Sequence, residues 1–504
     1  MAALYLSRTI RRIETAWIGV LPEGTLMRRA AAAVAASAER VARTLPRATP
    51  IVALVGPGNN GGDALLALMM LHARGYATRA LFASDRRPDA PDAAGVHDRF
   101  VAGGGRVDAL DSLASMLDAP VLVVDGLFGI GLARPLQGAI AGAAARLRAC
   151  GAVVVAVDTP SGIDADTGAV VGGPDAIAVR AHRTVTMIGD KPGLHTGAAT
   201  EHAGEIEVAD LGLDAMPDAT PLAPDGLLFE GDDARSLLPA RPANAHKGSF
   251  GSVLVVGGAR GMSGAALLAA RASQACGAGR TLIASPDEPV FDPAQPQLMT
   301  RPIDAPLEGV DAICIGCGLG RGEAARAALA GALASALPLV LDADALNLVS
   351  GDPALARARR ARGGRRDAPA RTVRTPPPLE AARLLECDTA AVQSDRIGAA
   401  LDLSARLACT VVLKGAGTVV ASPQRSWSLV CEGTPALATA GSGDVLAGAI
   451  AALCAQGVAN EPAAALAAWL HGHAARRWQR DHPVGAGLSA ARLPELLTEA
   501  MQPQ

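Results

Sequence analysis

Short apolar runs alternate with helix-prone stretches along most of this chain. In the first half, apolar residues fill the runs IVALV (51–55), TRALF (78–82), VLVV (121–124) and VVVAV (153–157). A polar or glycine-rich loop follows each run, and the stretch 9–44 reads as helix. Buried strands that alternate with helices predict an α/β fold with a parallel, doubly wound sheet.

The alternation is interrupted between residues 211 and 245, where proline and aspartate accumulate. We therefore predict an N-terminal domain over 1–215, a linker over 216–240 and a C-terminal domain over 241–504. After the interruption a second series of buried strands begins, in the segments GSVLVV, DAICIG, LPLVLD and TVVLKG. The length of 504 residues fits this division, because one hydrophobic core rarely serves so long a chain.

Polar side chains follow the apolar runs of the first half. Ligands of doubly wound sheets bind beyond the carboxyl ends of the strands, which is where the sequence places Asn59, Asn60, Asp63, Asp125, Asp158 and Ser161. The segment GPGNNGG (56–62) fits a dinucleotide-binding pattern, but its amide and carboxylate oxygens also suit a hard cation. Asn60, Asp125 and Ser161 would converge on such an ion if their strands are neighbours. The alternative is ordinary turn chemistry in tight loops.

The segment ATAGSGDVLAGAIAAL (438–453) is the most informative stretch of the second half. Its glycines precede Asp444 and an apolar run that predicts a helix. Backbone N–H groups at such a helix start bind phosphate, and a carboxylate in the first turn can take a proton from a substrate hydroxyl. The alternative is that Asp444 only caps the helix.

Composition and charge exclude several classes of function. The formal net charge is −3 and only 2% of residues are aromatic, so neither a basic field nor stacking rings would bind nucleic acid. We predict that the arginine-rich run 357–371 is a solvated loop. No signal peptide and no apolar segment of about 20 residues is present, so we expect a cytoplasmic protein that does not enter membranes.

Cysteine and lysine usage adds two points. The eight cysteines show no disulfide framework, and for the pair Cys314 and Cys317 we favour small-residue packing over zinc or redox chemistry. Almost every basic residue is arginine, and the only lysines are Lys191, Lys247 and Lys414. Where arginine is the default cation, a retained lysine is a candidate for a role that needs a compact ammonium group, although chance survival explains any single one.

Three motifs of the first half, GPGNNGGD, VVDGLFGIGLARPLQG and AVDTPSGIDADTG, together resemble the NAD(P)H-hydrate epimerase domain over about residues 5–210. The resemblance implies a Rossmann-like three-layer sandwich that interconverts the R and S forms of hydrated NADH and NADPH. It implies potassium held by Asn60, Asp125 and Ser161, with Asp125 and Asp158 as our acid–base candidates. The implied substrate contacts are Asn59, Asn60, Gly61, Gly62, Asp63, Gly129, Ile130, Gly131, Leu132, Ala133, Arg134, Pro135 and Asp158.

The motifs of the second half, HKGSFGSVLVVGGARGMSGAALLAARA, GCGLGRG, VLDADALNLV, LKGAGT and GTPALATAGSGDVLAG, resemble the ADP/ATP-dependent NAD(P)H-hydrate dehydratase domain, a ribokinase-like fold, over about residues 240–490. The resemblance implies ADP or ATP as co-substrate, with magnesium on its phosphates. The implied nucleotide contacts are Lys414, Gly415, Ala416, Gly417 and Thr418, and, within 434–443, Thr439, Ala440, Gly441, Ser442 and Gly443. The implied substrate contacts are Ala265, Gly318, Gly320, Glu380 and the catalytic Asp444.

Some positions depart from these families or stay open. Pro377 occupies the place, next to substrate, where the dehydratase family normally has histidine. In the first half, Ala64 and Ala31 stand where the epimerase family usually has glycine. Asp342 and Asp344 follow a strand and either orient the site or cap the next helix.

The sequence therefore predicts a two-domain enzyme of metabolite repair, acting as a homo-oligomer on hydrated NADH and NADPH. Its first domain would epimerise the hydrates, and its second would dehydrate the S form with ADP or ATP. Two alternatives are a ribokinase-like small-molecule kinase, which leaves the first half unexplained, and a non-catalytic nucleotide-binding protein, which would bind ligand without turnover.

Overall fold

Alternate residues of the strands in the first half point to opposite faces of one parallel sheet. In β2 (Ile51–Val55), Ile51, Ala53 and Val55 join one hydrophobic cluster, whereas Val52 and Leu54 join another. A strand whose two faces are both buried reads as a continuous apolar run, which is what the sequence shows. The prediction of a doubly wound sheet is confirmed here.

The sheet of the first half has seven parallel strands in the order β4-β3-β2-β5-β6-β7-β8. Its strands besides β2 are β3 (Thr78–Phe82), β4 (Asp108–Ala109), β5 (Leu122–Gly126), β6 (Val153–Val157), β7 (Arg183–Met187) and β8 (Glu205–Ala209). Its helices include α3 (Asn59–Ala73), α4 (Pro91–Ala102), α5 (Gly138–Cys150) and the 3₁₀ helices η1 (Leu110–Met116), η2 (Pro192–His195) and η3 (Gly197–Glu201). The strand order reverses between β2 and β5, which is where such sheets bind ligands.

The stretch 9–44 forms two helices and not one, which corrects the sequence-based expectation. Helix α1 (Ser7–Ile18) ends before Pro22, and α2 (Thr25–Ala42) begins after Gly24, whose φ of 66° suits glycine. Buried residues recur at helical spacing along α2, from Met27 to Ala38. This face of α2 packs against α3, so both helices help to form the core on one side of the sheet.

The second half contains a larger sheet, which from β9 onward runs in the order β9-β18-β17-β16-β15-β14-β13-β10-β11-β12. Its strands are β9 (Gly226–Leu228), β10 (Ser252–Val256), β11 (Arg280–Ala284), β12 (Met299–Thr300), β13 (Ala312–Ile315), β14 (Leu339–Leu341), β15 (Thr372–Arg374), β16 (Thr410–Leu413), β17 (Thr418–Ala421) and β18 (Trp427–Val430). From β12 to β16 all pairs are parallel, while β16, β17 and β18 pair antiparallel. An antiparallel extension at one end of the parallel sheet was not predicted from the sequence.

Helices cover both faces of this sheet. They are α6 (Gly231–Leu237), α7 (Ser263–Ala275), α8 (Glu323–Ala334), α9 (Ala343–Gly351), α10 (Pro353–Gly363), α11 (Pro378–Leu385), α12 (Thr389–Ser394), α13 (Arg396–Leu407), α14 (Ser442–Ala455), α15 (Asn460–Asp481) and α16 (Leu493–Ala500), with the 3₁₀ helices η4 (Lys247–Phe250), η6 (Pro435–Leu437) and η7 (Ala490–Arg492). Every residue of α14 from Val445 to Cys454 is buried, because α7, α15 and the sheet surround it. The apolar run after Asp444 is therefore a central helix, as predicted.

The first part of the arginine-rich run 357–371 is a helix and not the solvated loop that we expected. Residues 357–363 belong to helix α10, and 364–370 lie outside the described residues. Arg362 is buried and donates hydrogen bonds to backbone carbonyls of Ser335 and Leu337 and to the hydroxyl of Thr372. Carbonyl groups at strand and helix ends thus satisfy a guanidinium that composition alone assigns to the surface.

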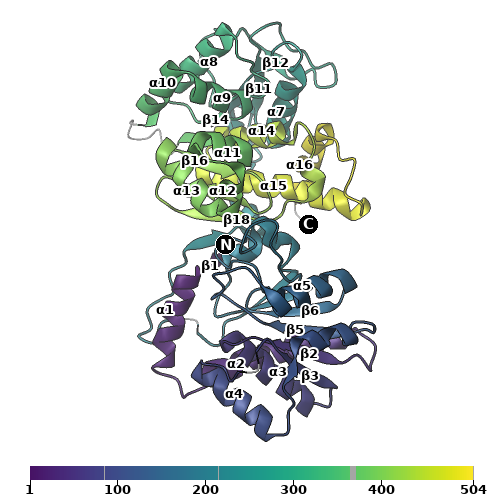
Figure 1. Ribbon diagram of the computed structural model, residues 1–504. Coiled ribbons are helices and arrows are strands. Elements are labelled where there is room, and N and C mark those ends of the chain that lie inside the picture. Colours follow the sequence, from purple (N-terminus) through teal and green to yellow (C-terminus); the bar gives the residue numbers. More distant parts are fainter. Residues whose placement is uncertain (85, 214, 364–370, 503–504) are drawn as a thin grey trace. The chain divides into compact units, whose positions relative to one another are not determined.

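The computed structural model describes residues 1–84, 86–213, 215–363 and 371–502. It divides into two compact units, Ala3–Gly226 and Leu227–Gln504, the latter with Met1–Ala2; Figure 1 draws them in purple to blue and in teal to yellow. The short strand β1 (Ala2–Leu4) contains one of the division points, and the expected linker 216–240 contains β9 and α6.

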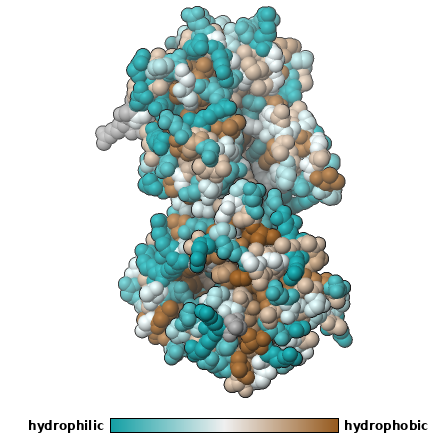
Figure 2. Space-filling model, viewed as in Figure 1, coloured by the Kyte–Doolittle hydropathy of each residue, from teal (hydrophilic) through white to brown (hydrophobic). Residues whose placement is uncertain are grey.

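No helix of the described part is both long and apolar enough to cross a membrane. On the face drawn in Figure 2, hydrophilic and hydrophobic residues are interspersed on each unit. Isolated apolar residues on a surface are ordinary and mark no binding site by themselves.

Candidate active sites

The first site lies at the carboxyl ends of three neighbouring strands, β2, β5 and β6. Asn60 is in the first turn of α3, Asp125 is the second-last residue of β5, and Asp158 directly follows β6. The structure therefore brings together polar residues that are far apart in the sequence, as the strand pattern predicts.

Asp125 and Ser161 form a buried hydrogen-bonded pair. The Asp125 carboxylate accepts bonds from the Ser161 backbone N–H (2.9 Å), from its hydroxyl (2.7 Å) and from the Leu127 N–H (3.3 Å). Its side chain has no solvent exposure, and among the described residues it has no cationic partner. Burial raises the pKa of Asp125, although these hydrogen bonds oppose the rise. A buried carboxylate without a counter-charge is a place where a cation would be stabilising.

Asp158 is held by a lysine that the sequence did not assign to the site. Lys191 is completely buried, and its Nζ lies 2.8 Å from Asp158 Oδ1. The same ammonium group donates to Thr186 Oγ1 (2.7 Å) and to the carbonyls of Met187 (3.0 Å) and Gly189 (3.3 Å). With four oxygens around it, the Lys191 ammonium group is held in place and fixes the position of the Asp158 carboxylate.

The loop after β5 brings Asn60 and Asp158 to the same place. A Cβ built on Gly129 would lie 2.9 Å from both Asn60 Oδ1 and Asp158 Oδ2, so a larger residue there would displace these two side chains. The Ile130 N–H points at Asp158 Oδ2 (3.4 Å). Further along this loop, the predicted substrate contacts are half-buried at Leu132 and exposed at Gly131, Ala133, Arg134 and Pro135.

Two more carboxyl groups face Asp158. The pKa of Asp63 is well above its usual range, mainly through burial and then through the charge of Asp158. The pKa of Glu14, on α1, is raised by the same two causes in the same order. Asp63 was predicted as a substrate contact, whereas Glu14 was not predicted, because it lies in a helix with no recognisable motif. Three carboxyl groups, two of them with raised pKa values, therefore lie close together in this site.

The two alanines that replace family glycines are both accommodated. Ala64 is buried, and a Cβ built on Gly126 would lie only 2.3 Å from the Ala64 Cβ. The extra methyl group therefore occupies space that Gly126 leaves empty. Ala31 is buried among the core residues of α2. Neither substitution displaces a predicted ligand of the site.

The second site lies at the carboxyl ends of β14, β15 and β16. Asp342 follows β14 and is almost fully buried; its Oδ1 accepts bonds from Lys414 Nζ (3.0 Å) and from Thr375 Oγ1 (2.6 Å). It makes no side-chain cap to α9, so the capping interpretation of Asp342 is wrong. Burial lowers the pKa of Lys414, but the charge and hydrogen bond of Asp342, together with the charge of Glu380, oppose it, and the net pKa is raised. Asp342 thus orients a charged lysine.

Asp444 lies beside this pair, in the first turn of α14. Gly441 precedes the helix with φ 90°, a conformation that favours glycine. A Cβ built on Gly443 would lie 3.1 Å from Lys414 Nζ, so the helix start closely approaches the ammonium group. Burial, and then the charge of Asp342, raise the pKa of Asp444 to about 6. A carboxylate with this pKa is ionised at neutral pH yet still accepts a proton readily.

Pro377 and Glu380 are at the start of α11. Pro377 has extended backbone (φ −73°, ψ 169°) and precedes the helix, so it causes no strain there. Its carbonyl accepts from the Ala381 N–H, and the neighbouring Pro376 carbonyl accepts from the Lys414 N–H. Burial raises the pKa of Glu380 to about 7, although Lys414 opposes the rise, and its Oε2 is buried without a hydrogen bond. Glu380 is thus close enough to Lys414 for the two charges to interact.

The predicted substrate contacts Ala265, Gly318 and Gly320 also lie together. A Cβ built on Gly318 would lie 3.2 Å from the Ala265 Cβ. The Gly320 N–H donates to Asp344 Oδ2 (2.9 Å), so Asp344 fixes this loop. The place of Asp344 after a strand left two interpretations open, orienting the site or capping the next helix, and this hydrogen bond favours the first.

The predicted nucleotide contacts occupy two loops. The segment Lys414–Thr418 connects β16 to β17, and the buried Arg396 donates to the carbonyls of Leu413, Lys414 and Gly417. Within 434–443, Thr434 begins η6 by accepting from the Ala436 N–H, and Thr439, Ala440, Gly441, Ser442 and Gly443 lead into α14. Arg396 was not predicted, because an arginine at a helix start resembles any surface arginine.

One trio of side chains in the described part could hold a metal ion: Cys317, Asp342 and Asp444, whose ligand atoms lie within 4.8 Å of one another. Magnesium prefers oxygen ligands. Here one of the three is a thiol, and Asp342 is already balanced by Lys414. The trio therefore does not fit magnesium, and we derive no step from an ion held by it.

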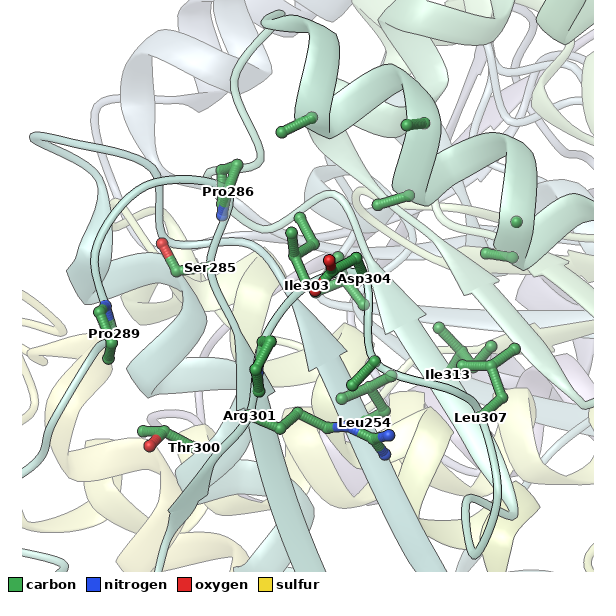
Figure 3. A pocket seen from close by; sticks show the side chains of 18 of the residues that line it. Leu254, Ser285, Pro286, Pro289, Thr300, Arg301, Ile303, Asp304, Leu307 and Ile313 are labelled. Atoms are coloured by element: carbon green, nitrogen blue, oxygen red, sulfur yellow. The ribbon is translucent and has the colours of Figure 1, made fainter.

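A cavity of about 840 Å³ lies elsewhere in the second unit, between the sheet and α8. Figure 3 shows its floor at Leu254 and Ile313 and the segment with Ile303 and Asp304 beside it. None of the predicted site residues lines it. Lys247, the third lysine, is exposed in η4 and lines a smaller cavity of about 250 Å³ with Arg280. The larger cavity has Asp287, Arg301 and Asp304 among its lining residues, and most of its other lining side chains are apolar.

Comparison with known proteins gives a consistent result for both units. Residues 23–193 match the family model of the YjeF-related protein N-terminus, and residues 253–499 match that of NAD(P)H-hydrate dehydratase. Proteins from Coxiella burnetii and Gloeobacter violaceus, both named bifunctional NAD(P)H-hydrate repair enzyme Nnr, are 35% and 38% identical; the alignments cover 95% and 96% of this chain and 95% of each relative.

A solved structure of the ADP/ATP-dependent NAD(P)H-hydrate dehydratase from Bacillus subtilis, co-crystallised with ATP and Mg²⁺, is 31% identical and covers 55% of this chain and 98% of its own, with a TM-score of 0.46. The identity and coverage of the two bacterial relatives, together with the two family models, decide the assignment. The chain belongs to the family of bifunctional NAD(P)H-hydrate repair enzymes.

Proposed function

We propose that residues 1–215 epimerise the R and S hydrates of NADH and NADPH, and that residues 241–504 dehydrate the S form with ADP or ATP. The observation that carries the proposal is the surroundings of Asp444: a pKa of about 6, the ammonium of Lys414 and the glycine-rich start of α14 in one place. This combination suits proton removal from a hydroxyl and charge stabilisation on a phosphoryl group.

In the proposed dehydration, the Asp444 carboxylate takes the proton of the substrate hydroxyl as its oxygen attacks the terminal phosphoryl group of the nucleotide. The bond from that phosphorus to the leaving nucleotide breaks. Phosphate then departs with the carbon–oxygen bonding electrons, and loss of a ring proton restores the double bond. The N–H groups of Gly441 and Gly443 and the ammonium group of Lys414 stabilise the charge on the transferred group. Magnesium on the nucleotide phosphates would supply further positive charge.

Glu380 has a place in this scheme. Its pKa of about 7 and its unpaired Oε2 make it a group that is partly protonated at neutral pH. A protonated carboxyl can donate a hydrogen bond to substrate. We therefore assign substrate contact to Glu380, with Pro377 supplying only apolar surface. Ala265, Gly318 and Gly320 would form the opposite wall.

In the proposed epimerisation, Asp158 is the acid–base group and Asp125 is the ion ligand. Both Asp125 oxygens are occupied by the donors of Ser161 and Leu127, and the residue is fully buried, whereas Asp158 faces the loop of Gly129. Asp63 and Glu14, whose pKa values are raised, would supply protons.

Asn60, Asp125 and Ser161 would hold the potassium ion in this scheme, because an uncompensated buried carboxylate and neutral oxygens suit a monovalent cation. When bound, the ion would supply positive charge beside the substrate. The substrate itself would contact Asn59–Asp63 and the exposed part of the loop 129–135.

The direct test measures stoichiometry. The S hydrate of NADH is supplied with magnesium and either ADP or ATP, and recovered NADH and released inorganic phosphate are both quantified. The proposal expects one phosphate for each NADH. A stable phosphorylated product would favour the small-molecule kinase, and nucleotide binding without turnover would favour a non-catalytic protein.

A further inference from the structure

The cysteine pair of the second unit is not used by the mechanism above. Cys317 lies in the glycine loop that follows β13, and both it and Cys314 are completely buried. Their sulfur atoms are 4.0 Å apart. On its other side, the Cys317 Sγ lies within 4.8 Å of carboxylate oxygens of Asp342 and Asp444. The thiol is thus placed between the strand core and the proposed base.

The surroundings keep this thiol protonated. The pKa of Cys317 is well above its usual range because of the hydrogen bond with Cys314, burial, and the negative charges of Asp444 and Asp342. Either cysteine can be the donor in the contact between the two thiols, and where Cys314 donates, the S–H group of Cys317 is free to donate to a carboxylate. The hydrogen bond from Cys317 lowers the pKa of Asp444, in opposition to burial and to Asp342, which raise it.

Charged groups from several elements face Asp444. Asp342 and Asp344, between β14 and α9, raise its pKa, while Lys414, after β16, lowers it. Glu380 of α11 also faces Lys414, whose charge opposes the rise that burial causes in the pKa of Glu380. Burial, and then the charge of Lys414, lower the pKa of His471 of α15 to about 4, so this imidazole is neutral at neutral pH. Within this set, Cys317 differs in contributing a hydrogen bond without a charge, so it can orient Asp444 without neutralising it.

We propose that Cys317 is a positioning residue, whose S–H group donates to the Asp444 carboxylate and holds it in the orientation in which it accepts the substrate's hydroxyl proton. The inference rests on the proposed role of Asp444. It assigns to one half of the Cys-x-x-Cys pair a function in catalysis, where packing alone would treat Cys314 and Cys317 alike.

The test is the pH dependence of kcat/KM for dehydration, which reports ionisations of the free enzyme. Asp444 must be ionised to accept a proton, so the rate falls as pH decreases through its pKa of about 6. In Cys317→Ala the donor is lost, the carboxylate is less stabilised, and the acid limb moves up by roughly half a pH unit. At pH values below the limb, kcat/KM of Cys317→Ala is about threefold lower than that of the parent protein. Cys317→Ser restores a hydrogen-bond donor, so its acid limb returns towards that of the parent protein.

Cys314→Ala is the matched control, because it removes an equally buried thiol that does not contact Asp444. It should leave the acid limb where it is in the parent protein. An acid limb that is unmoved in Cys317→Ala, or that moves equally in Cys314→Ala, would overturn the inference. Absence of nucleotide-dependent dehydration in the parent protein would instead overturn the proposed function. Nucleotide binding by each variant shows that the second unit is folded.

Discussion

Each unit places a lysine–aspartate pair beyond the carboxyl ends of a parallel sheet, but the two pairs are built differently. Lys191 is completely buried, with four oxygens around its ammonium group. Lys414 keeps 22% of its side chain exposed, and Asp342 is the partner to which it donates at 3.0 Å. The start of α14 approaches the same ammonium group.

This difference separates a lysine that fixes a neighbour from one that can meet a ligand. All three protons of Lys191 are used within the protein, so its role is to position Asp158. Lys414 retains bonding capacity towards the place where a phosphoryl group would lie. The same pair of residue types thus holds a neighbouring carboxylate in one unit and, in the proposed function, contacts a phosphoryl group in the other.

The largest expected effect comes from removing the proposed base of the second unit. Asp444→Asn keeps the size of the side chain but abolishes proton acceptance, so nucleotide-dependent dehydration of the S hydrate should fall roughly a thousandfold. Exchange between R and S hydrates, followed by chromatographic separation, should be unchanged and serves as the control. Appreciable dehydration by this variant would remove Asp444 from its assigned role.

The comparison of the two lysines is tested by stability. Lys191→Met removes the ammonium group that Asp158 and three other buried oxygens contact. The free energy of unfolding of the first unit should therefore decrease by about 3–5 kcal/mol. Hydrogen exchange resolved by peptide would show lost protection in β7.

Lys414→Met is the matched variant for this experiment. Because Lys414 is partly exposed, the same measurement on the second unit should give a clearly smaller change. Equal losses of protection in the two units would contradict the distinction between the buried Lys191 and the partly exposed Lys414.

Asn60→Ala tests the ion site of the first unit. Loss of one oxygen ligand should raise the potassium concentration for half-maximal epimerisation by about tenfold, since such a contact is worth roughly 1–2 kcal/mol. Rates measured in potassium and in sodium salts at constant ionic strength give the result. An unchanged potassium dependence would place the ion elsewhere.

Pro377→His should have the smallest effect. The imidazole would add a hydrogen bond to substrate, so the KM for the S hydrate should fall a few-fold with little change in kcat. Because Pro377 precedes α11 and does not interrupt it, stability should change by less than about 1 kcal/mol. A large gain in kcat would mean that the missing histidine acts in the chemical step.

Sequence reasoning predicted the parts of the fold and sites that depend on local pattern. Apolar runs followed by polar loops gave the strands β2, β5 and β6 and the residues at their ends. The α/β fold and the family assignment are confirmed by the structure and the comparisons. The roles of individual site residues, the potassium ion and the homo-oligomer stay predictions.

What the sequence did not show depends on contacts between distant segments. Lys191 is 33 positions beyond Asp158, and nothing in its neighbours indicates the partner. Cys317 was predicted to pack, and only the tertiary structure places its thiol beside Asp444. The arginines of α10 suggest solvent exposure until Arg362 is seen bonded to carbonyl groups of Ser335 and Leu337.

The most direct test of the account is a single assay of the whole protein with mixed R and S hydrates of NADH. Magnesium, potassium and either ADP or ATP are present, and the return of reduced-nicotinamide absorbance is followed to completion. Two cooperating sites predict recovery of both epimers, because the first unit replenishes the S form that the second consumes. Recovery that stops at the S fraction would contradict an active first site, and no recovery with either nucleotide would contradict the second.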